Sequence, residues 1–211
     1  MREQRLKMIK EHLIARGIGD RRVLEIMGNL QRERFVPSKY VKDSYGDHPI
    51  SIGYNQTISQ PYIVALMSEL CEFSGNEKVL EIGSGSGYQS AVLSALSSRV
   101  FSIERIKPLA ERAKKVLKEL GCGNVTVIHN DGYNGFIEEA PFDVIMLTAA
   151  PGTIPAALIE QLADGGKLVA PVGGSLSQKL IRLKKVSGDV ISETITFVSF
   201  VPMIKGRSDD D

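Results

Sequence analysis

Short apolar segments alternate with amphipathic ones from Lys78 onward, and this alternation constrains the fold more than any other feature of the chain. Strands that alternate with helices in this way form parallel sheets, and right-handed crossovers place helices on the faces of the sheet. The sequence therefore predicts an α/β fold with a doubly wound, mostly parallel sheet. The expected order is a strand at 78–82, a helix at about 87–97, a strand at 99–103, a helix at 107–120, strands at 124–128 and 142–147, a helix near 155–162 and a strand at 167–170.

The region before this pattern is expected to form a helical N-terminal cap. Apolar side chains recur at helical spacing from about residue 2 to residue 35, and a break in the spacing ends with Asp20, which can cap a second helix. Residues 36–59 contain prolines, glycines and several tyrosines, and we expect them to form an irregular connection. Pro61 then begins a helix that continues to about Leu70.

The C-terminal region departs from the parallel pattern in a different way. Two alternating apolar stretches, at 179–186 and 190–201, flank the turn Ser187-Gly188-Asp189. This arrangement predicts a β-hairpin that completes one edge of the sheet. Residues 205–211 are expected to form a disordered tail.

A glycine-rich turn follows the first strand of the α/β pattern. The segment 79–82 contains Glu81 and leads directly into Gly83-Ser84-Gly85-Ser86-Gly87. Glycines at such a turn let an adenosine-bearing ligand approach the backbone closely, and Glu104, at the end of the next strand, stands where a carboxylate meets the ribose hydroxyls. Asp131-Gly132, after the third strand, adds an acid and a flexible turn where an adenine amino group could be held.

The residue that directly follows this turn indicates which kind of nucleotide binds. Tyr88 occupies the position of the third, helix-packing glycine in dinucleotide-binding turns, which disfavours NAD. An S-adenosyl cofactor has no pyrophosphate, so it needs close backbone approach and less of a phosphate-binding helix terminus. Each of the three acids also has an alternative role that involves no cofactor. Asp131 could belong to an ordinary turn at the end of a strand, Glu81 could be a strand residue hydrogen-bonded to a nearby backbone group, and Glu104 could be a surface acid.

Several further segments carry a resemblance that covers nearly the full length of the chain. They are Arg32-Glu33-Arg34-Phe35-Val36-Pro37, Ile52-Gly53-Tyr54-Asn55-Gln56-Thr57-Ile58-Ser59-Gln60-Pro61, Val79–Gln89, Ser102-Ile103-Glu104-Arg105, Ala140-Pro141-Phe142-Asp143 and 165–173. With these segments the chain resembles the protein-L-isoaspartate (D-aspartate) O-methyltransferase family. The segment that ends at Pro61 is specific to that family, whereas the glycine-rich turn is shared by many S-adenosylmethionine-dependent enzymes. Two departures are Asn55, in place of a glycine of the substrate loop, and Phe136, in place of a tryptophan.

This resemblance implies a Rossmann-like methyltransferase fold and a set of site residues. The cofactor S-adenosyl-L-methionine, with S-adenosyl-L-homocysteine as product, is expected to contact Glu81, Gly83, Ser84, Gly85, Glu104, Asp131 and Gly132. Ser59 matches the active-site serine, and the substrate is expected to contact Thr57, Ile58, Ser59 and Val201. The implied domain organisation is a single methyltransferase domain over 1–211, with 1–70 as helical cap and substrate loop, 78–204 as cofactor-binding core and 205–211 as tail.

The family's reaction agrees with the chemistry of the residues present. Its implied substrates are age-damaged proteins and peptides in which an isoaspartyl carboxyl group is methylated, so that a succinimide can form and return some normal aspartate; acceptance of D-aspartyl residues stays open. A carboxylate with a pKa of about 4 is already ionised at neutral pH, so no general base is needed. Ser59 is expected to aim the carboxylate, with a helix N-cap as its alternative role.

Composition excludes several other classes of protein. The 211 residues, 43% hydrophobic and 24% charged, suit one soluble globular domain, and a formal net charge of +1 provides no field for nucleic acid. No apolar run of about 18 residues and no signal peptide are seen, so no membrane partner is expected. Two unpaired cysteines favour the cytoplasm, and three dispersed histidines predict no metal. We expect a monomer.

Three rival functions are weighed against this interpretation. Another S-adenosylmethionine-dependent transferase would act on a small molecule or nucleic acid, but 147–151 read Leu-Thr-Ala-Ala-Pro rather than the Asn/Asp-Pro-Pro-aromatic segment of enzymes that methylate base amino groups. A nicotinamide-dependent reductase lacks a Tyr-x-x-x-Lys pair after the nucleotide-binding half. A non-catalytic sensor of an adenosyl ligand would have no reason to keep the segment around Ser59.

Overall fold

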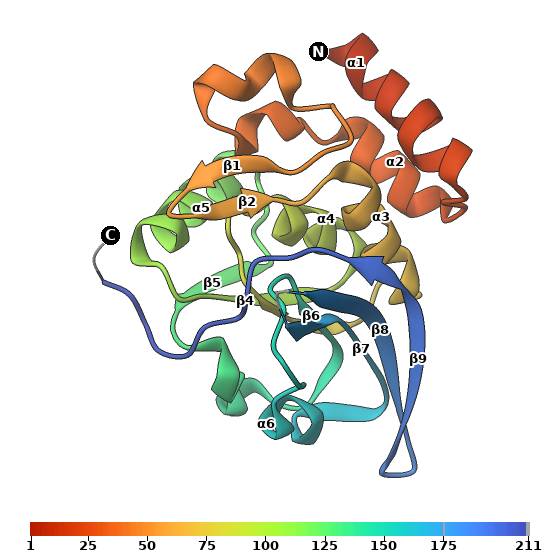
Figure 1. The fold of residues 1–211 in the computed structure, drawn as a ribbon, viewed down its shortest axis with the longest axis vertical. Helices are drawn as coiled ribbons and strands as arrows, with labels where there is room; N and C mark the ends of the chain where they lie inside the picture. Colours follow the sequence, from red (N-terminus) through yellow and green to blue (C-terminus); the bar gives the residue numbers. More distant parts are fainter. Residues whose placement is uncertain (175, 210–211) are drawn as a thin grey trace.

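The computed structural model describes residues 1–174 and 176–209 and is built around a seven-stranded sheet (Figure 1). The strand order is β5-β4-β3-β6-β7-β8-β9, in which the first five strands run parallel and β8 is antiparallel to both of its neighbours. Strands β3, β4 and β5 extend the sheet toward one edge, and the chain then returns to place β6 on the other side of β3, as in a doubly wound fold. The bounds are β3 Lys78–Ile82, β4 Arg99–Glu104, β5 Val125–His129, β6 Phe142–Leu147, β7 Leu162–Gly174, β8 Ser177–Val186 and β9 Asp189–Val198.

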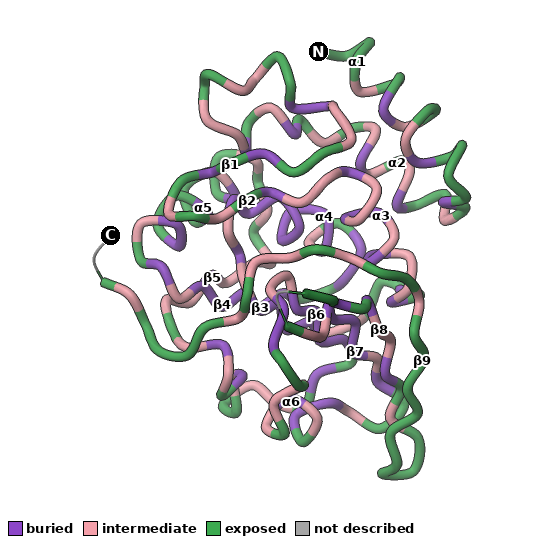
Figure 2. The backbone as a smooth tube through the Cα atoms, in the orientation of Figure 1, coloured by how far each residue is buried: buried purple, intermediate pink, exposed green. Residues whose placement is uncertain are grey.

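Helices cover both faces of the sheet, and each face has its own apolar core. The face covered by α3 Pro61–Leu70, α4 Tyr88–Leu96 and α5 Lys107–Glu119 buries residues such as Val64, Leu93 and Leu109. The opposite face is covered by α6 Ala156–Glu160 and by 3-10 turns at Gly132–Asn134 and Ile137–Glu139. Figure 2 shows the buried residues concentrated on the central strands β3, β4, β6 and β7. The predicted α/β fold is therefore confirmed.

The expected helical cap is also present at the N-terminus. Helix α1 Arg2–Lys7 continues through a π-helical turn at Met8–Leu13 and a 3-10 turn at Ile14–Arg16. Helix α2 Arg21–Asn29 begins at Asp20, whose carboxylate accepts hydrogen bonds from the amides of Arg22 and Val23, 2.8 and 3.3 Å away. Both elements pack near α3, on the face that carries α4 and α5.

The connection predicted to be irregular contains regular structure of its own. Two 3-10 helices, Arg32–Phe35 and Ser38–Asp43, precede an antiparallel hairpin of β1 Ile50–Gly53 and β2 Gln56–Ile58. Its turn holds Tyr54 and Asn55, both with φ 54°, and asparagine is one of the few side chains that adopt this left-handed conformation readily. Asn55 thus fits a position where a glycine was expected. Figure 1 shows the hairpin between α5 and α3, above the sheet.

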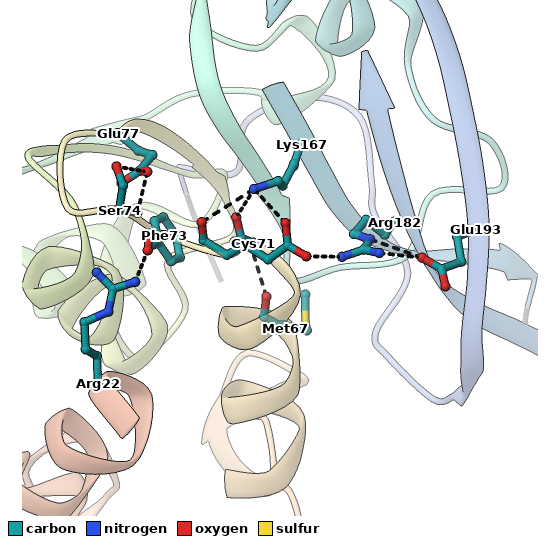
Figure 3. Close-up of polar contacts among 10 residues, drawn as sticks. Arg22, Met67, Cys71, Phe73, Ser74, Glu77, Lys167, Arg182 and Glu193 are labelled. Carbon is teal, nitrogen blue, oxygen red and sulfur yellow. Dashed lines mark hydrogen bonds and ion pairs between the residues drawn. The ribbon is translucent and has the colours of Figure 1, made fainter. Parts of the chain in front are cut away.

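Helix α3 is anchored to the sheet at its C-terminal end (Figure 3). The Lys167 ammonium of β7 donates to the carbonyl of Cys71, 3.0 Å away, and forms an ion pair with Glu72. Arg182 of β8 pairs with Glu72 at 3.0 Å and with Glu193 of β9 at 2.7 Å. These contacts fix the far end of a helix whose N-terminus immediately follows Ser59 and Gln60.

The C-terminal hairpin is confirmed, but the segment after it differs from the prediction. After β9 the chain crosses the sheet at the carboxyl ends of the parallel strands (Figure 1). Met203 donates to the carbonyl of Ala150 at 2.8 Å, and the Ser208 amide and carbonyl pair with Arg105 and Lys107. The expected disordered tail is therefore wrong through Ser208, because its backbone groups find partners at the ends of β4 and β5. The last two residues of that expected tail, 210 and 211, lie outside the described residues.

The connection from β6 to β8 is more extended than the sequence indicated. Strand β7 begins at Leu162, inside the expected helix, and includes Gly165 and Gly166 as an irregular stretch. Phe142 pairs with Leu162, while Val144 pairs with Lys167, so extra residues of β7 are accommodated between the two pairs.

Within the described ranges, no helix is both long and apolar enough to cross a membrane.

Candidate active site

A cavity opens where the carboxyl ends of the parallel strands meet the hairpin β1–β2 and the C-terminal segment. Connections after β3, β4, β5 and β6 all contribute to its wall, which is the usual place for a ligand in an open α/β sheet. Most of the residues predicted from the sequence are brought together there. They are Thr57, Ile58, Ser59, Gly83, Ser84, Gly85, Glu104, Gly132 and Val201.

The glycine-rich turn forms the floor of the cavity and requires its glycines for steric reasons. Gly83 has φ 101°, and a Cβ atom there would lie 2.4 Å from the Thr148 hydroxyl oxygen. Its amide donates to the carbonyl of Ile103 at 2.7 Å, and the Gly87 amide donates to the Ser84 carbonyl at the same distance. The turn therefore presents bare backbone to the cavity, which lets a ligand approach closely.

Glu104 lies at the end of β4, where the sequence predicted a carboxylate. It lines the cavity although it is only 5% exposed. One carboxylate oxygen accepts from the Gly85 amide at 2.8 Å and the other from the Ile106 amide at 3.0 Å. Burial raises the pKa of Glu104, and these backbone donors act against that rise. Each oxygen keeps a lone pair for a ligand hydroxyl, so the side chain is held ready for a diol.

Glu81 is not among the residues that line the cavity, and its expected contact with the cofactor stays a prediction. It is fully buried, because it precedes the last residue of β3, a central strand whose residues from 79 to 82 are all buried. Its Oε2 accepts from Ser102 at 2.5 Å and from Ser90, and Ser102 in turn contacts the Ser84 hydroxyl at 2.5 Å. Burial raises the pKa of Glu81 to about 7 despite these hydrogen bonds. The carboxyl group therefore supports the turn from beneath.

Asp131 is also outside the cavity wall, whereas its neighbour Gly132 belongs to it. The Asp131 carboxylate accepts from the amides of Tyr133, at 2.9 Å, and Gly206, at 2.8 Å. It thus ties the C-terminal segment to the end of β5. A Cβ at Gly132 would lie 2.3 Å from Ile82, so only glycine leaves the backbone room here.

Ser59 lies at the cavity mouth, between β2 and α3, and its hydroxyl has no hydrogen-bond partner among the described residues. The alternative role as a helix cap is not seen. Instead, the Asp47 carboxylate accepts from the Tyr62 amide at 3.1 Å in the first turn of α3. Thr57 and Ile58 precede Ser59 on the same wall, and Val201 belongs to the C-terminal segment. The Ser59 hydroxyl is therefore free to bind a ligand.

Several wall residues were not identified from the sequence. Thr148 follows β6 and donates to the carbonyls of Gly83, at 2.6 Å, and Ile82, at 3.0 Å. The rule that located Glu104, a polar residue at the carboxyl end of a parallel strand, could have located Thr148. Further wall residues include Gln56 and Gln89, which lie in segments singled out by the sequence, and Val64, Met67, Met203 and Ile204, whose segments only the fold brings to the cavity. Among the described side chains, no group of three His, Cys, Asp or Glu residues could hold a metal ion.

Comparison with solved structures places this architecture in a known class. A Plasmodium falciparum structure in complex with S-adenosyl-L-homocysteine, which carries the name protein-L-isoaspartate O-methyltransferase, matches with a TM-score of 0.83 and 28% identity, covering 95% of this chain and 98% of its own. A second protein-L-isoaspartate O-methyltransferase gives a TM-score of 0.85 and 29% identity over 96% of this chain and 65% of its own longer chain. Fold and site together define a Rossmann-like, S-adenosylmethionine-dependent methyltransferase.

The family follows from sequence comparison. The family model for protein-L-isoaspartate(D-aspartate) O-methyltransferase matches residues 3–208. The chain belongs to this family. A protein-L-isoaspartate O-methyltransferase from Geobacter metallireducens is 49% identical over 201 residues, 95% of this chain and 93% of its own. One from Methanoculleus marisnigri is 46% identical, over 96% of this chain and 92% of its own.

Proposed function

We propose that this protein transfers the methyl group of S-adenosyl-L-methionine to the free carboxyl group of L-isoaspartyl residues in damaged proteins and peptides. The observation that carries this proposal is the free hydroxyl of Ser59 at the mouth of a cavity whose floor is the glycine-rich turn. The family match adds the acceptor, since the matched segments include the hairpin around Ser59 as well as the turn.

The residues of the floor fit an S-adenosyl group. Gly83 and Gly85 would leave room for its amino-acid portion along the backbone, and Glu104 would accept hydrogen bonds from its ribose hydroxyls. Gly132 would leave room in the wall for the adenine. Asp131 would act by holding the Gly206 amide, and Glu81 by holding the Ser102 hydroxyl beneath the turn. When bound, the cofactor supplies a methyl group made electrophilic by its sulfonium.

The protein's part in the reaction is to bind and orient the acceptor. An isoaspartyl carboxylate is ionised at neutral pH and needs no general base, and the wall contains no histidine or cysteine among its described residues. Ser59 would donate a hydrogen bond to one carboxylate oxygen and leave the other directed into the cavity. Apolar side chains such as Ile58, Val64 and Val201 exclude water and so favour alignment.

The product would be a methyl ester that promotes repair without further catalysis. The backbone nitrogen after the modified residue displaces methanol from the ester carbonyl and closes a succinimide, and hydrolysis of this ring returns some normal aspartate. The partners are then flexible segments of aged proteins. Acceptance of D-aspartyl residues, a monomeric state, a cytoplasmic location and the absence of nucleic-acid or membrane partners stay predictions from the sequence and the family.

The decisive experiment measures transfer of a radiolabelled methyl group to three peptides that differ at one position only, which is isoaspartate, aspartate or D-aspartate. Base-labile volatile label is expected with the isoaspartyl peptide and not with the aspartyl peptide. The variant Ser59→Ala should lose most of the transfer while it still binds S-adenosyl-L-homocysteine. Ser51→Ala, an exposed hydroxyl on the same hairpin, serves as the matched control and should keep activity. Cofactor binding without label on any peptide would refute the proposed acceptor.

A further inference from the structure

Arg32 is a completely buried cation next to the proposed acceptor site. It begins a 3-10 helix, is 0% exposed, and forms no ion pair among the described residues. Its Nε donates to the carbonyl of Ser44 and one terminal nitrogen donates to the carbonyl of Ser59, each at 2.7 Å. Buried charges are normally paired with an opposite charge because their desolvation is costly, so this arrangement requires an explanation.

A second observation concerns the remaining nitrogen of the guanidinium. Arg32 Nη1 is buried and has no hydrogen-bond partner, and the same is true of the Tyr88 hydroxyl. The Arg32 guanidinium lies over the Tyr88 ring, 4.7 Å from its centroid. Tyr88 lines the cavity and directly follows Gly87 of the glycine-rich turn. Arg32 therefore lies between two parts of the wall, the serine of the hairpin and the start of α4.

Other charges near the acceptor site do not fill this role. Arg105 is the one arginine among the described residues that line the cavity, whereas Arg32 lies behind the wall; Arg105 follows Glu104 and donates to the carbonyl of Gly206. Arg112 holds the same hairpin by donating to the Ile52 carbonyl at 2.8 Å, but it contacts β1 rather than Ser59. Among these arginines, only Arg32 is joined directly to the backbone of Ser59.

We propose that Arg32 is a positioning residue for the acceptor carboxylate: it fixes Ser59 against Tyr88 and supplies the positive charge toward which that carboxylate is drawn. The inference rests on the proposed function, since it assumes a carboxylate at Ser59. A fixed cation in a dry site acts on a nearby anion far more strongly than a solvated one does. The Asp47 carboxylate acts on Arg32 through space but pairs with Arg16 rather than with Arg32, so a direct counter-charge for Arg32 is left for the substrate to provide.

The test compares binding of two peptides to the protein saturated with S-adenosyl-L-homocysteine. One peptide carries isoaspartate, and the other carries the uncharged carboxamide at the same carboxyl group. The wild type should prefer the carboxylate peptide. Arg32→Gln, which keeps one donor and loses the charge, should reduce that preference at least about tenfold, whereas Arg32→Lys should retain it within about threefold; each tenfold change corresponds to 1.4 kcal/mol.

The controls separate a structural role from an electrostatic one. If Arg32 only stabilises the fold, both peptides will weaken equally in Arg32→Gln, and this result would overturn the proposal. Arg112→Gln, which removes the other arginine contact to the hairpin, should leave the preference unchanged. Should Arg32→Gln fail to fold by circular dichroism, loss of the preference in a folded Arg32→Lys variant would overturn the proposal, and its retention would support it. Failure of the wild type to methylate any isoaspartyl peptide would instead refute the proposed function itself.

Discussion

The Thr148 hydroxyl donates a hydrogen bond to the carbonyl of Gly83, 2.6 Å away, and so joins the loop after β6 to the glycine-rich turn after β3. A second carbonyl, that of Ile82, lies 3.0 Å from the same hydroxyl. Because the turn has little secondary structure of its own, a side chain that holds its first carbonyl and the last carbonyl of β3 fixes the cavity floor.

Replacement of Thr148 by valine keeps the shape of the side chain and removes the hydroxyl. We expect the affinity for S-adenosyl-L-homocysteine to fall by about 1 kcal/mol, or about fivefold, because the Gly83 carbonyl loses its side-chain donor, while the Ile82 carbonyl keeps the Thr148 amide 2.9 Å away. Thr148→Ser, which keeps the hydroxyl, should bind nearly as well as the wild type. Isothermal titration calorimetry measures all three proteins, and equal affinity of the valine variant would show that the hydroxyl does not order the turn.

Gly83→Ala should disrupt cofactor binding more severely. The new Cβ would lie 2.4 Å from the Thr148 hydroxyl oxygen, and alanine is strained at φ 101°. Such strain costs on the order of 1–3 kcal/mol, so both thermal stability and cofactor affinity should decrease. Gly152→Ala is the matched control, because no atom lies within 4 Å of its Cβ position. Normal cofactor affinity in Gly83→Ala would contradict the role assigned to this turn.

The buried carboxyl of Glu81 predicts a specific dependence of stability on pH. Its pKa of about 7 in the folded protein lies above the ordinary value of 4.5, so folding favours the protonated form. The stability contributed by this group is complete below about pH 4.5 and is lost as the pH rises through about 7, by an amount on the order of 3 kcal/mol.

Glu81→Gln removes this titration while it keeps a side chain of similar size. Urea unfolding at about pH 5 and about pH 8 should show that the variant loses less stability than the wild type over this interval. The other titrating groups are the same in both proteins, so their contribution cancels in the comparison. Parallel losses in the two proteins would mean that Glu81 is ionised in the folded state at both pH values.

Val201 allows the acceptor side of the cavity to be tested separately. Val201→Trp should raise the KM for an isoaspartyl peptide several-fold by filling part of the cavity that Ser59 also lines, while the affinity for S-adenosyl-L-homocysteine changes little. Ile137→Trp enlarges an exposed apolar side chain elsewhere and should affect neither quantity. Steady-state kinetics with a varied peptide measure the effect, and an unchanged KM would remove Val201 from the acceptor wall.

Sequence patterns predicted the parallel sheet because each strand is an apolar run and each crossover helix shows apolar residues at helical spacing. The predictions were incomplete for segments whose structure depends on contacts with residues far away in the sequence. Strands β1 and β2 are only four and three residues long, and their turn relies on left-handed Tyr54 and Asn55 rather than on glycine. The C-terminal segment has no periodicity, and its hydrogen bonds reach residues such as Ala150 and Arg105, far earlier in the chain.

The two glutamates show the same limit at the level of one side chain. Glu81 and Glu104 lie on neighbouring parallel strands, and both were predicted to contact the cofactor. Glu81 pairs in register with Ser102, in the middle of the sheet, whereas Glu104 is the last residue of its strand. Whether a carboxylate reaches the cavity depends on its place in its own strand: Glu104 ends β4, whereas Ile82 still follows Glu81 in β3, and sequence patterns do not fix strand ends to one residue.

The cavity wall gathers residues from Gln56 to Ile204, so a ligand seated in it contacts segments that lie far apart in the sequence. Such a ligand binds the folded protein and has no comparable site in the unfolded chain. At a hundred times its dissociation constant it would add about 2.7 kcal/mol to the free energy of unfolding. A cell rich in cofactor would thereby slow proteolysis of this protein and raise its abundance without any change in its synthesis.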